Sequence, residues 1–470
     1  MQAKLATFGM PFDIGATAGL AEPNAPPVVA ASAARAAHSK AIASERIPQW
    51  EAWRETAHRI KAWTIAHLDR LLVQFEEQVT ARGGKVLWAE DAAQANAIIL
   101  DIAQGKGVRT VVKAKSMATE EIGLNHALAD AGIRSMETDL GEYIVQLAGQ
   151  RPTHIIGPAM HMSAAEIGKL FAEKLGTAYT ESPENLIAEA RKRLRQDYLD
   201  AQLGISGVNF GVAETGTIVV VENEGNGGLS MAAPSVHVAV TGIEKLLPRM
   251  ADVPVFLNLL ARSGTGQALS TYTHFIQGPE SPRELYVILL DNGRTRILAD
   301  RASRQSLYCI RCGACLNVCP VYRRAGGWAY GWVYPGPIGA VTTPHLVPLE
   351  LSGELPFASS LCGACQEACP VKIDIPHQLL HLRHEAVTRP SPMRSLGERL
   401  TWRLWSWAMR GPRRYRLLGW LGLRVALPLA RRSPWKPGKP GKWLRAWERG
   451  RDLPEVPAQS FKAWWRSRTP

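Results

Sequence analysis

The chain has 470 residues, of which 46% are hydrophobic and 21% charged, and its formal net charge is +13. This composition is that of an ordinary globular protein, and it excludes wholesale disorder and a multi-span membrane protein. Residues 391–470 hold 19 Lys and Arg against 4 Asp and Glu, which leaves a net charge of −2 for residues 1–390. We therefore predict a nearly neutral body with a basic appendage.

The N-terminal segment 1–45 is rich in Ala and Pro and has few charges. It predicts a flexible leader, and a transit peptide is a weaker interpretation because Arg is scarce there. The following segment, 46–80, carries apolar residues at helical spacing from Trp50 to Phe75 and predicts one long amphipathic helix.

Residues 81–300 alternate short apolar runs with helical stretches, which is the rhythm of βαβ units. The predicted strands are 85–88, 109–112, 135–138, 208–213, 217–222, 237–241 and 285–290, and the predicted helices are 92–104, 119–131 and 183–203. We expect one α/β domain in which a single, mostly parallel sheet continues to about residue 300.

The first cysteine group has the spacing C-x2-C-x2-C-x3-C-P, formed by Cys309, Cys312, Cys315, Cys319 and Pro320. This is the ferredoxin spacing for a [4Fe–4S] cluster, because two-residue gaps let three thiolates wrap one face of the cubane. In two-cluster ferredoxins the fourth cysteine binds the other cluster.

A second group repeats the unit Cys-Gly-Ala-Cys-x3-Cys-Pro-Val with Cys362, Cys365 and Cys369, and Ser359 stands in the register of the missing first cysteine. Crossed ligation assigns Cys309, Cys312, Cys315 and Cys369 to cluster 1, and Cys319, Cys362 and Cys365 to cluster 2. Cluster 1 is then [4Fe–4S]. Cluster 2 is [3Fe–4S], or [4Fe–4S] completed by Ser359, a histidine or a small molecule.

Two alternatives compete with redox clusters. Zinc also takes cysteine ligands, but three cysteines in C-x2-C-x2-C are crowded around one tetrahedral ion. The clusters could also be purely structural, although crossed ligation brings two clusters close enough to exchange electrons, which favours electron transfer. All seven cysteines lie between Cys309 and Cys369, unlike a secreted disulfide scaffold, so we expect a cytoplasmic protein.

We predict a ferredoxin-like module over residues 301–390. Its segment 326–356 is rich in Gly, Pro and aromatic residues, and we expect an ordered insertion because exposed tryptophans and tyrosines are costly. The tail, 391–470, carries nine of the 15 tryptophans and no uncharged apolar run long enough to span a bilayer. Its Arg and Trp suit docking to a partner subunit first, peripheral contact with the inner face of a membrane second, and nucleic acid last.

With these motifs in place, residues 45–470 resemble the lactate utilization protein B (LutB/LldF) family. The resemblance is carried by segments 113–125, 138–144, 154–161, 213–217, 223–227 and 460–465, and by the form of the second cysteine group with Ser359. It implies a LUD α/β domain similar to the phosphosugar isomerase and CoA-transferase class. It also implies the iron–sulfur subunit of a three-protein system that oxidises L-lactate to pyruvate.

Other candidate residues lie in the α/β region. The Gly-rich segments 214–217 and 223–228 flank a predicted strand and are either ligand loops or tight turns. Neither has the G-x-G-x-x-G form, so we predict no dinucleotide site. His154 and His161 are either packed histidines or groups for ligation or proton transfer.

We therefore predict an electron-transfer subunit that accepts electrons from lactate oxidation and delivers them to a partner or a membrane acceptor such as quinone. In one alternative the α/β domain itself oxidises a hydroxy acid, with Lys113, Lys115 and Ser116 as an anion clamp after a strand, unless these lysines are simply solvated. A second alternative is a nucleic-acid-binding protein with structural clusters.

Overall fold

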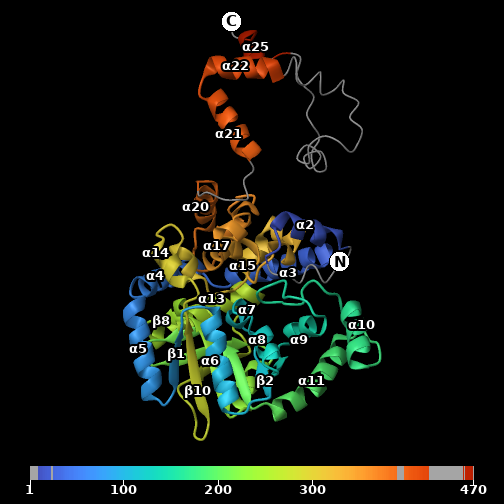
Figure 1. The fold of residues 1–470 in the computed structure, drawn as a ribbon, viewed down its shortest axis with the longest axis vertical. Helices are drawn as coiled ribbons and strands as arrows, with labels where there is room; N and C mark the ends of the chain where they lie inside the picture. Colours follow the sequence, from blue (N-terminus) through green and yellow to red (C-terminus); the bar gives the residue numbers. More distant parts are fainter. Residues whose placement is uncertain (1–8, 23–24, 389–395, 423–458, 460, 469–470) are drawn as a thin grey trace. The chain divides into compact units, whose positions relative to one another are not determined.

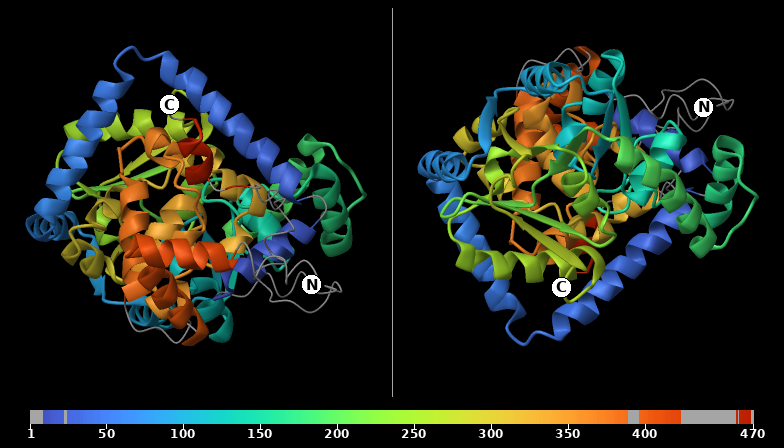
Figure 2. Two further views of the ribbon diagram at one scale, coloured as in Figure 1. Left: turned by 90° about the horizontal axis from the view of Figure 1, so that it is seen from above. Right: turned by 90° about the horizontal axis from the view of Figure 1, so that it is seen from below.

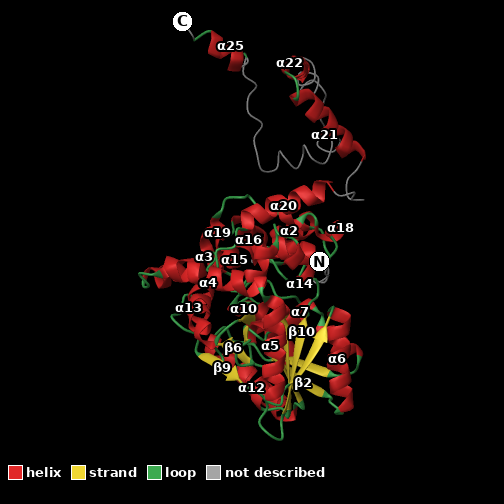
Figure 3. Cartoon of the chain, turned by 90° about the vertical axis from the view of Figure 1, so that its left-hand side faces the viewer, coloured by secondary structure: helices red, strands yellow, loops and turns green. Residues whose placement is uncertain are grey.

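The computed structural model describes residues 9–22, 25–388, 396–422, 459 and 461–468 (Figure 1). The described residues up to 388 form one compact unit, and those from 396 onward belong to a second unit. In the first unit the strands gather at one end and the helices around the cysteines gather at the other (Figure 3).

The main sheet has six strands, and every neighbouring pair in it is parallel. In sheet order these are β1 (Lys85–Ala89), β10 (Glu284–Leu290), β7 (Val236–Gly242), β4 (Leu203–Gly207), β2 (Thr110–Lys113) and β3 (Arg134–Glu137). The central strands are buried apolar runs, as expected for a sheet covered on both faces. The α/β prediction is confirmed here.

A second sheet has the order β8 (Leu246–Leu247), β5 (Phe210–Val212), β6 (Thr217–Glu222) and β9 (Tyr272–Ile276). The prediction of one continuing sheet was therefore wrong. Only four residues connect β5 to β6, and Gly216 turns the chain there with a φ of +64°. Such a short connection makes an antiparallel hairpin, whereas a parallel crossover needs a dozen residues or more.

The remaining helices of the α/β region are α6 (Ala92–Gly105), α7 (Met117–Glu121), α8 (Leu124–Asp130), α9 (Leu140–Leu147), α10 (Ala164–Leu175), α11 (Pro183–Asp200), α12 (Asn226–Ala232), α13 (Val253–Thr265) and α14 (Arg294–Ala299). The helix predicted over 119–131 is two helices, because Gly123 adopts a left-handed φ of 65° between them. The helix predicted over 183–203 ends at Asp200, and the following residues form strand β4.

The N-terminal segment is helical. Helices α2 (Phe12–Ala21) and α3 (Ala25–Glu45) replace the predicted flexible leader over those residues. Small side chains explain the difference, because Val29 and Ala33 of α3 are buried and permit close packing against α13 and the helices around the cysteines. Figure 2 shows α3 running along the outside of the body to a corner, where α4 begins.

The helix predicted over 46–80 is broken at His67 into α4 (Trp50–Ala66) and α5 (Leu68–Ala81). The break occurs because His67 has a φ of −123° and a ψ of 27°, outside the helical range. The apolar face of α5, from Leu68 to Val79, is buried in the same core as the second sheet.

The cysteine region is a set of short helices: η3 (Arg304–Tyr308), α15 (Ala314–Val318), α16 (Pro320–Ala325), η4 (Trp328–Tyr330), α17 (Gly336–Leu346), α18 (Leu349–Ser352), η5 (Leu355–Phe357), α19 (Ala364–Ala368) and α20 (Ile375–Thr388). The insertion over 326–356 is ordered, because Trp328, Tyr330 and Tyr334 are buried and Trp332 is half-buried. One apolar core runs from the second sheet into this region.

The second unit contains α21 (Leu396–Met409), α22 (Pro412–Leu421) and α25 (Phe461–Arg466). Within these helices Trp402, Trp405, Trp407, Trp420 and Trp465 are exposed. Trp435, Trp443 and Trp447 lie outside the described residues. Over the part of the chain that is described, we find no helix with the length and apolar character needed to cross a bilayer.

Candidate metal centres

The two cysteine motifs share an unusual backbone. Arg311 and Leu361, which precede Cys312 and Cys362, have positive φ angles of 61° and 55°. The glycines after the two cysteines, Gly313 and Gly363, have φ angles of 73° and 84°. Non-glycine residues adopt this region only where the surrounding structure holds them in it. The repeat in sequence is therefore also a repeat in conformation.

Four cysteines line one small cavity. Cys309, Cys312 and Cys315 of the first motif lie there together with Cys369 of the second. Most of the other lining side chains are apolar, including Ile155, Ile310, Ile338, Val371 and Ile373. Cys309 is half-buried and the other three are buried. Burial raises the pKa of the Cys312 thiol to about 12, and the neighbouring Cys369 raises it as well.

The remaining three cysteines lie close enough to one another to interact. Burial raises the pKa of the Cys365 thiol to about 12, and Cys319 and Cys362 add to this effect. Cys362 is exposed, and the backbone N–H of Ala364 lowers its pKa. The second group is therefore open to solvent on the side of Cys362.

Ser359 occupies the position that Cys309 has in the first motif. Its Oγ accepts a hydrogen bond of 3.1 Å from the backbone N–H of Leu361, as the Sγ of Cys309 accepts one of 3.4 Å from Arg311. The guanidinium of Arg383 donates to the carbonyl oxygen of Ser359 at 2.9 Å and fixes this segment. The register inferred from sequence is thus a structural equivalence.

No three of the thiols, all of which are described, lie as close together as ligands of one zinc ion would. With Zn–S bonds of about 2.3 Å, tetrahedral zinc requires sulfur atoms about 3.8 Å apart. The structure describes all seven cysteines, and no three of their sulfur atoms lie within 4.8 Å of one another. Backbone N–H groups of Tyr322 and Ile373 also point at the sulfurs of Cys319 and Cys369, at 3.5 and 3.4 Å. Such hydrogen bonds stabilise cluster thiolates.

Two cationic side chains of the N-terminal helices contact the cysteine region. Lys40 of α3 donates to the carbonyl oxygen of Ala368, and Arg54 of α4 donates to those of Glu367 and Cys369 at 2.9 and 2.8 Å. These residues cap the end of α19, where carbonyl oxygens lack helical partners. The sequence analysis missed Lys40, although the absence of Gly and Pro from residue 28 to 45 favours a helix.

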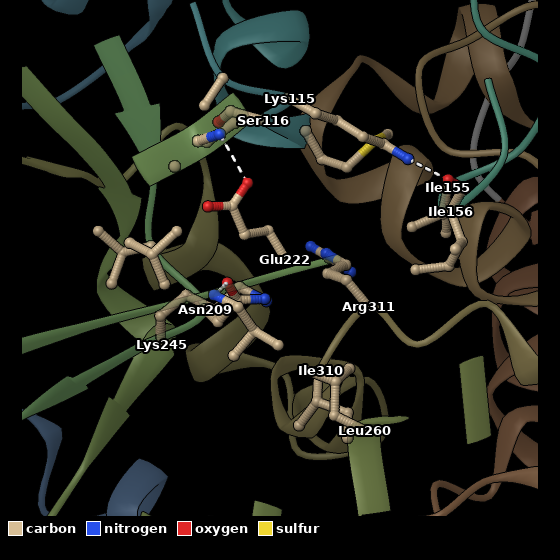
Figure 4. A pocket seen from close by; sticks show the side chains of 18 of the residues that line it. Lys115, Ser116, Ile155, Ile156, Asn209, Glu222, Lys245, Leu260, Ile310 and Arg311 are labelled. Carbon is tan, nitrogen blue, oxygen red and sulfur yellow. Dashed lines mark hydrogen bonds between the residues drawn. The ribbon is translucent and has the colours of Figure 1, made fainter. Parts of the chain in front are cut away.

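A separate pocket of about 400 Å³ lies beside the first cysteine group. It lies at the carboxyl ends of β2, β4 and β7 and is closed by the loop that holds Ile310 and Arg311. Figure 4 shows Lys115, Glu222, Lys245 and Arg311 around it. Of the predicted residues, Lys115, Ser116 and part of the segment 223–228 line this pocket.

Lys113 does not line the pocket. It is fully buried, and its Nζ lies 2.7 Å from Glu137 and 3.1 Å from Glu120. Both predictions for this residue, an anion clamp and a solvated lysine, were therefore wrong. The acidic partners lie in β3 and α7, and only the fold brings them to the end of β2.

His154 and His161 are packed histidines. The Nδ1 of His154 accepts from the backbone N–H groups of Ile156 and Gly157, and its Nε2 lies 3.2 Å from the side-chain oxygen of Asn317. Burial lowers the pKa of His154 to about 3 and that of His161 to about 4. Both rings are therefore neutral at physiological pH.

The segment 214–217 forms the turn between β5 and β6, away from the pocket. Gly216 packs directly on the backbone of Gln78 and Val79 in α5, and Glu214 accepts from the backbone N–H of Met250 at 2.8 Å. Of the two interpretations given above, the tight turn is correct here. The opposite end of β6 leads into the pocket.

Three family profiles together match most of the chain from residue 72 onward. The LUD domain matches residues 72–298, the 4Fe-4S dicluster domain residues 305–373, and the C-terminal region of lactate utilisation protein B residues 381–469. These matches confirm the predicted order of a LUD domain followed by an iron–sulfur module.

Several known proteins are similar over most of their length. Lactate utilization protein B of Oceanobacillus iheyensis is 42% identical over 90% of this chain and 89% of that protein. The protein of the same name from Bacillus pumilus is 42% identical over 91% and 90%. A protein of Escherichia coli K12 named "Uncharacterized electron transport protein YkgF" is 41% identical over 90% and 89%. A solved DUF162 family structure from Deinococcus radiodurans aligns with 47% of this chain and 98% of that chain, at 16% identity and a TM-score of 0.27.

Proposed function

Because this chain belongs to the lactate utilization protein B family, we propose that it is the iron–sulfur electron-transfer subunit of an L-lactate-oxidising system. The observation that carries the proposal is the shared cavity of Cys309, Cys312, Cys315 and Cys369. It supports crossed ligation, the arrangement that holds two clusters close together in ferredoxins. A dicluster profile over residues 305–373 and a relative named as an electron transport protein agree with this role.

The proposed ligands of cluster 1, of the [4Fe–4S] type, are Cys309, Cys312, Cys315 and Cys369. Those of cluster 2 are Cys319, Cys362 and Cys365, with Ser359 as the candidate fourth ligand. When bound, such clusters supply one-electron carriers. The apolar walls of the first cavity exclude water from its thiolates, which is one of the factors that set a reduction potential.

The two sites differ in their access to solvent. Cys312, Cys315 and Cys369 are buried, whereas Cys362 is exposed. We therefore place electron exchange with a partner protein on the side of Cys362, where a donor or acceptor can approach.

The acceptor is either a partner subunit or a membrane component such as quinone. The exposed tryptophans of α21 and α22 stand among arginines, as in Arg413, Arg414 and Arg416. Trp and Arg are the residues most favoured as anchors in protein interfaces, so a partner subunit is the first candidate. Retention of the full chain on anionic lipid vesicles, lost on removal of residues 391–470, would instead favour the membrane.

The alternative in which Lys113 clamps a hydroxy acid is not retained. The ammonium group of Lys113 already contacts Glu120, Glu137 and Thr119, and its side chain is fully buried. A substrate carboxylate would have to displace these partners.

Iron, acid-labile sulfide and EPR spectra of the anaerobically purified chain test the proposal. We expect about 8 iron per chain with two interacting reduced clusters, or about 7 with an oxidised [3Fe–4S] signal. Zinc in place of iron, or clusters that dithionite and the physiological partner cannot reduce, would contradict an electron-transfer role.

A further inference from the structure

The pocket beside the first cysteine group has no part in the function proposed above. Its volume of about 400 Å³ is within the range of small-molecule sites. It also lies where parallel α/β sheets commonly bind ligands, at the carboxyl ends of the strands. Position and size therefore point to a ligand, and the lining residues indicate its chemistry.

Two cations, Arg311 and Lys245, lie at the end of the pocket nearest the cysteines. The guanidinium of Arg311 stacks 4.3 Å from the centre of the Tyr334 ring, and its side chain is only 12% exposed. Its Nη1 has no hydrogen-bond partner among the described residues. The ammonium of Lys245 donates to the carbonyl oxygen of Cys309 at 3.3 Å.

The carboxylates nearby are already engaged. The guanidinium of Arg294 forms ion pairs with Glu244 at 2.6 Å and with Glu121 at 2.8 Å. Because two carboxylates share one guanidinium, the three side chains have a net charge of −1. Arg311 reaches Glu244 only at 3.7 Å. Arg311 and Lys245 therefore leave an excess of one positive charge. Lys61, which donates to the carbonyl oxygen of Glu244, is not counted, because burial lowers its pKa to about 7. Buried charge without a counter-charge is costly, so this end of the pocket favours an anion.

Three further carboxylates line the pocket, and each accepts hydrogen bonds from backbone N–H groups: Asp139 from Glu142, Glu224 from Leu140, and Glu222. Glu222 accepts from the backbone N–H groups of Gly227 and Gly228 at 2.6 and 2.7 Å, and His274 holds it at 2.7 Å. These two N–H groups lie at the start of α12, where backbone donors commonly bind phosphate. Here they already donate to the carboxylate of Glu222. This arrangement disfavours a phosphate ester.

The donors that remain suit a carboxylate with an organic body. A guanidinium matches the two oxygens of a planar carboxylate, and an adjacent ammonium adds a point charge. Apolar side chains of Ile156, Leu260 and Ile310 complete the walls. They can cover the carbon atoms of a small acid.

We propose that this pocket binds an organic carboxylate, with its charged end held by Arg311 and Lys245. Arg311 stands between Cys309 and Cys312 in the chain, so an occupant contacts the loop of the first cysteine group directly. The inference goes beyond electron transfer, because it assigns the LUD domain a ligand of its own. A bound cluster is also negatively charged and could neutralise the same cations in place of a carboxylate. Titration of the iron-loaded chain distinguishes these two possibilities.

The test is calorimetric titration of the iron-loaded full chain with L-lactate, pyruvate, hexanoate and inorganic phosphate. We expect at least one carboxylate to bind with a stoichiometry of one and phosphate to bind more weakly than that carboxylate. The affinity should fall by about tenfold or more in Arg311→Gln and Lys245→Met, the loss of one charge-assisted contact. Arg301→Gln, which removes an exposed arginine outside the pocket, should bind like the wild type.

Absence of carboxylate binding up to about 10 mM, tighter binding of phosphate, or unchanged affinity in both pocket variants would overturn the proposal. Iron content is measured for every variant. If Arg311→Gln loses iron, the carboxylate affinity of Lys245→Met tests the proposal instead, because this variant leaves the residues between the cysteines unchanged. Cys362→Ser separates this proposal from the function above, because it impairs the second cysteine group and should leave carboxylate binding intact.

Discussion

The ammonium nitrogen of Lys113 lies 2.7 Å from the carboxylate of Glu137, and both side chains are almost completely buried. The two residues face each other in register at the ends of the parallel strands β2 and β3. Burial alone would lower the pKa of Lys113, but Glu137, Glu120 and Glu142 together raise it above its usual value. Burial and the neighbouring carboxylates Glu137 and Glu120 raise the pKa of Glu142 well above its usual value.

Replacing Lys113 should therefore be strongly destabilising. In Lys113→Met the buried Glu137, whose pKa burial already raises to about 7, and the half-buried Glu120 lose their cation, and we expect a loss of about 3–5 kcal/mol in the free energy of unfolding. Urea denaturation of the variant measures this loss, with the exposed Lys169→Met as the control. The double variant Lys113→Met/Glu137→Gln should be more stable than the single one. A loss below about 1 kcal/mol would mean that the pair is not a structural element.

Buried histidines should make stability depend on pH. Burial lowers the pKa of His237 to about 4, and His154 and His161 behave similarly. In the unfolded chain a histidine titrates near pH 6.5, so between about pH 6.5 and 4 the unfolded state binds more protons. The stabilisation is complete above pH 6.5 and is lost as the pH falls, by about 1.4 kcal/mol per pH unit for each histidine.

His237 isolates this effect, because it lies in strand β7 and its Nε2 is 2.8 Å from the hydroxyl of Ser206. Unfolding of His237→Gln and wild type, followed from pH 7 to pH 4.5, should show a shallower loss of stability in the variant. The exposed His126→Gln serves as the control. Equal slopes for His237→Gln and wild type would show that the pKa of this ring is the same in the folded and the unfolded protein.

Crossed ligation predicts which cysteines act together. Cys369→Ser should remove the EPR signal that Cys312→Ser removes, although Cys369 belongs to the second motif. Cys319→Ser and Cys365→Ser should likewise remove the same EPR signal, because both residues are proposed ligands of cluster 2. Iron content and EPR of the dithionite-reduced variants distinguish the groups. If Cys369→Ser instead matched Cys365→Ser, each motif would hold its own metal centre and the crossed assignment would be wrong.

Ser359 carries the hydroxyl in the register of Cys309, and its role can be tested against the exposed Ser235 of the α/β region. If the hydroxyl binds the fourth iron of cluster 2, Ser359→Ala should lower iron from about 8 to about 7 per chain and increase an oxidised [3Fe–4S] signal. Ser235→Ala should change neither quantity. Identical spectra for both variants would exclude Ser359 as the ligand.

The packing of α3 can be tested at two neighbouring alanines. Ala33 is fully buried and Ala34 is exposed. Ala33→Glu places a charge in the contact with the helices around the cysteines, and we expect a loss of several kcal/mol in unfolding free energy and faster release of iron in air. Ala34→Glu should resemble the wild type in both measurements. Equal iron release from the two variants would show that α3 does not protect the clusters.

Local patterns were sufficient for much of the fold and for the metal centres. The parallel sheet was predictable because buried strands are continuous apolar runs at regular spacing. The cysteine ligands were predictable because cluster geometry restricts the gaps between them to two or three residues. The helical structure of segment 1–45 was not predictable. A helix of small residues, such as α3, has weak hydrophobic periodicity and resembles a flexible segment in composition.

The sequence by itself determined the two cysteine motifs, their repeat with Ser359 in place of a cysteine, the α/β class and the basic Trp-rich tail. Each of these features depends on residues that are close together in the chain. Only the tertiary structure decided that Lys113 is an internal cation with Glu137 as its partner, and that Arg311 and Lys245 meet at a pocket. The residues of such pairs lie 24 and 66 positions apart in the chain, and their charges interact only because folding brings them together in a buried, weakly polar region.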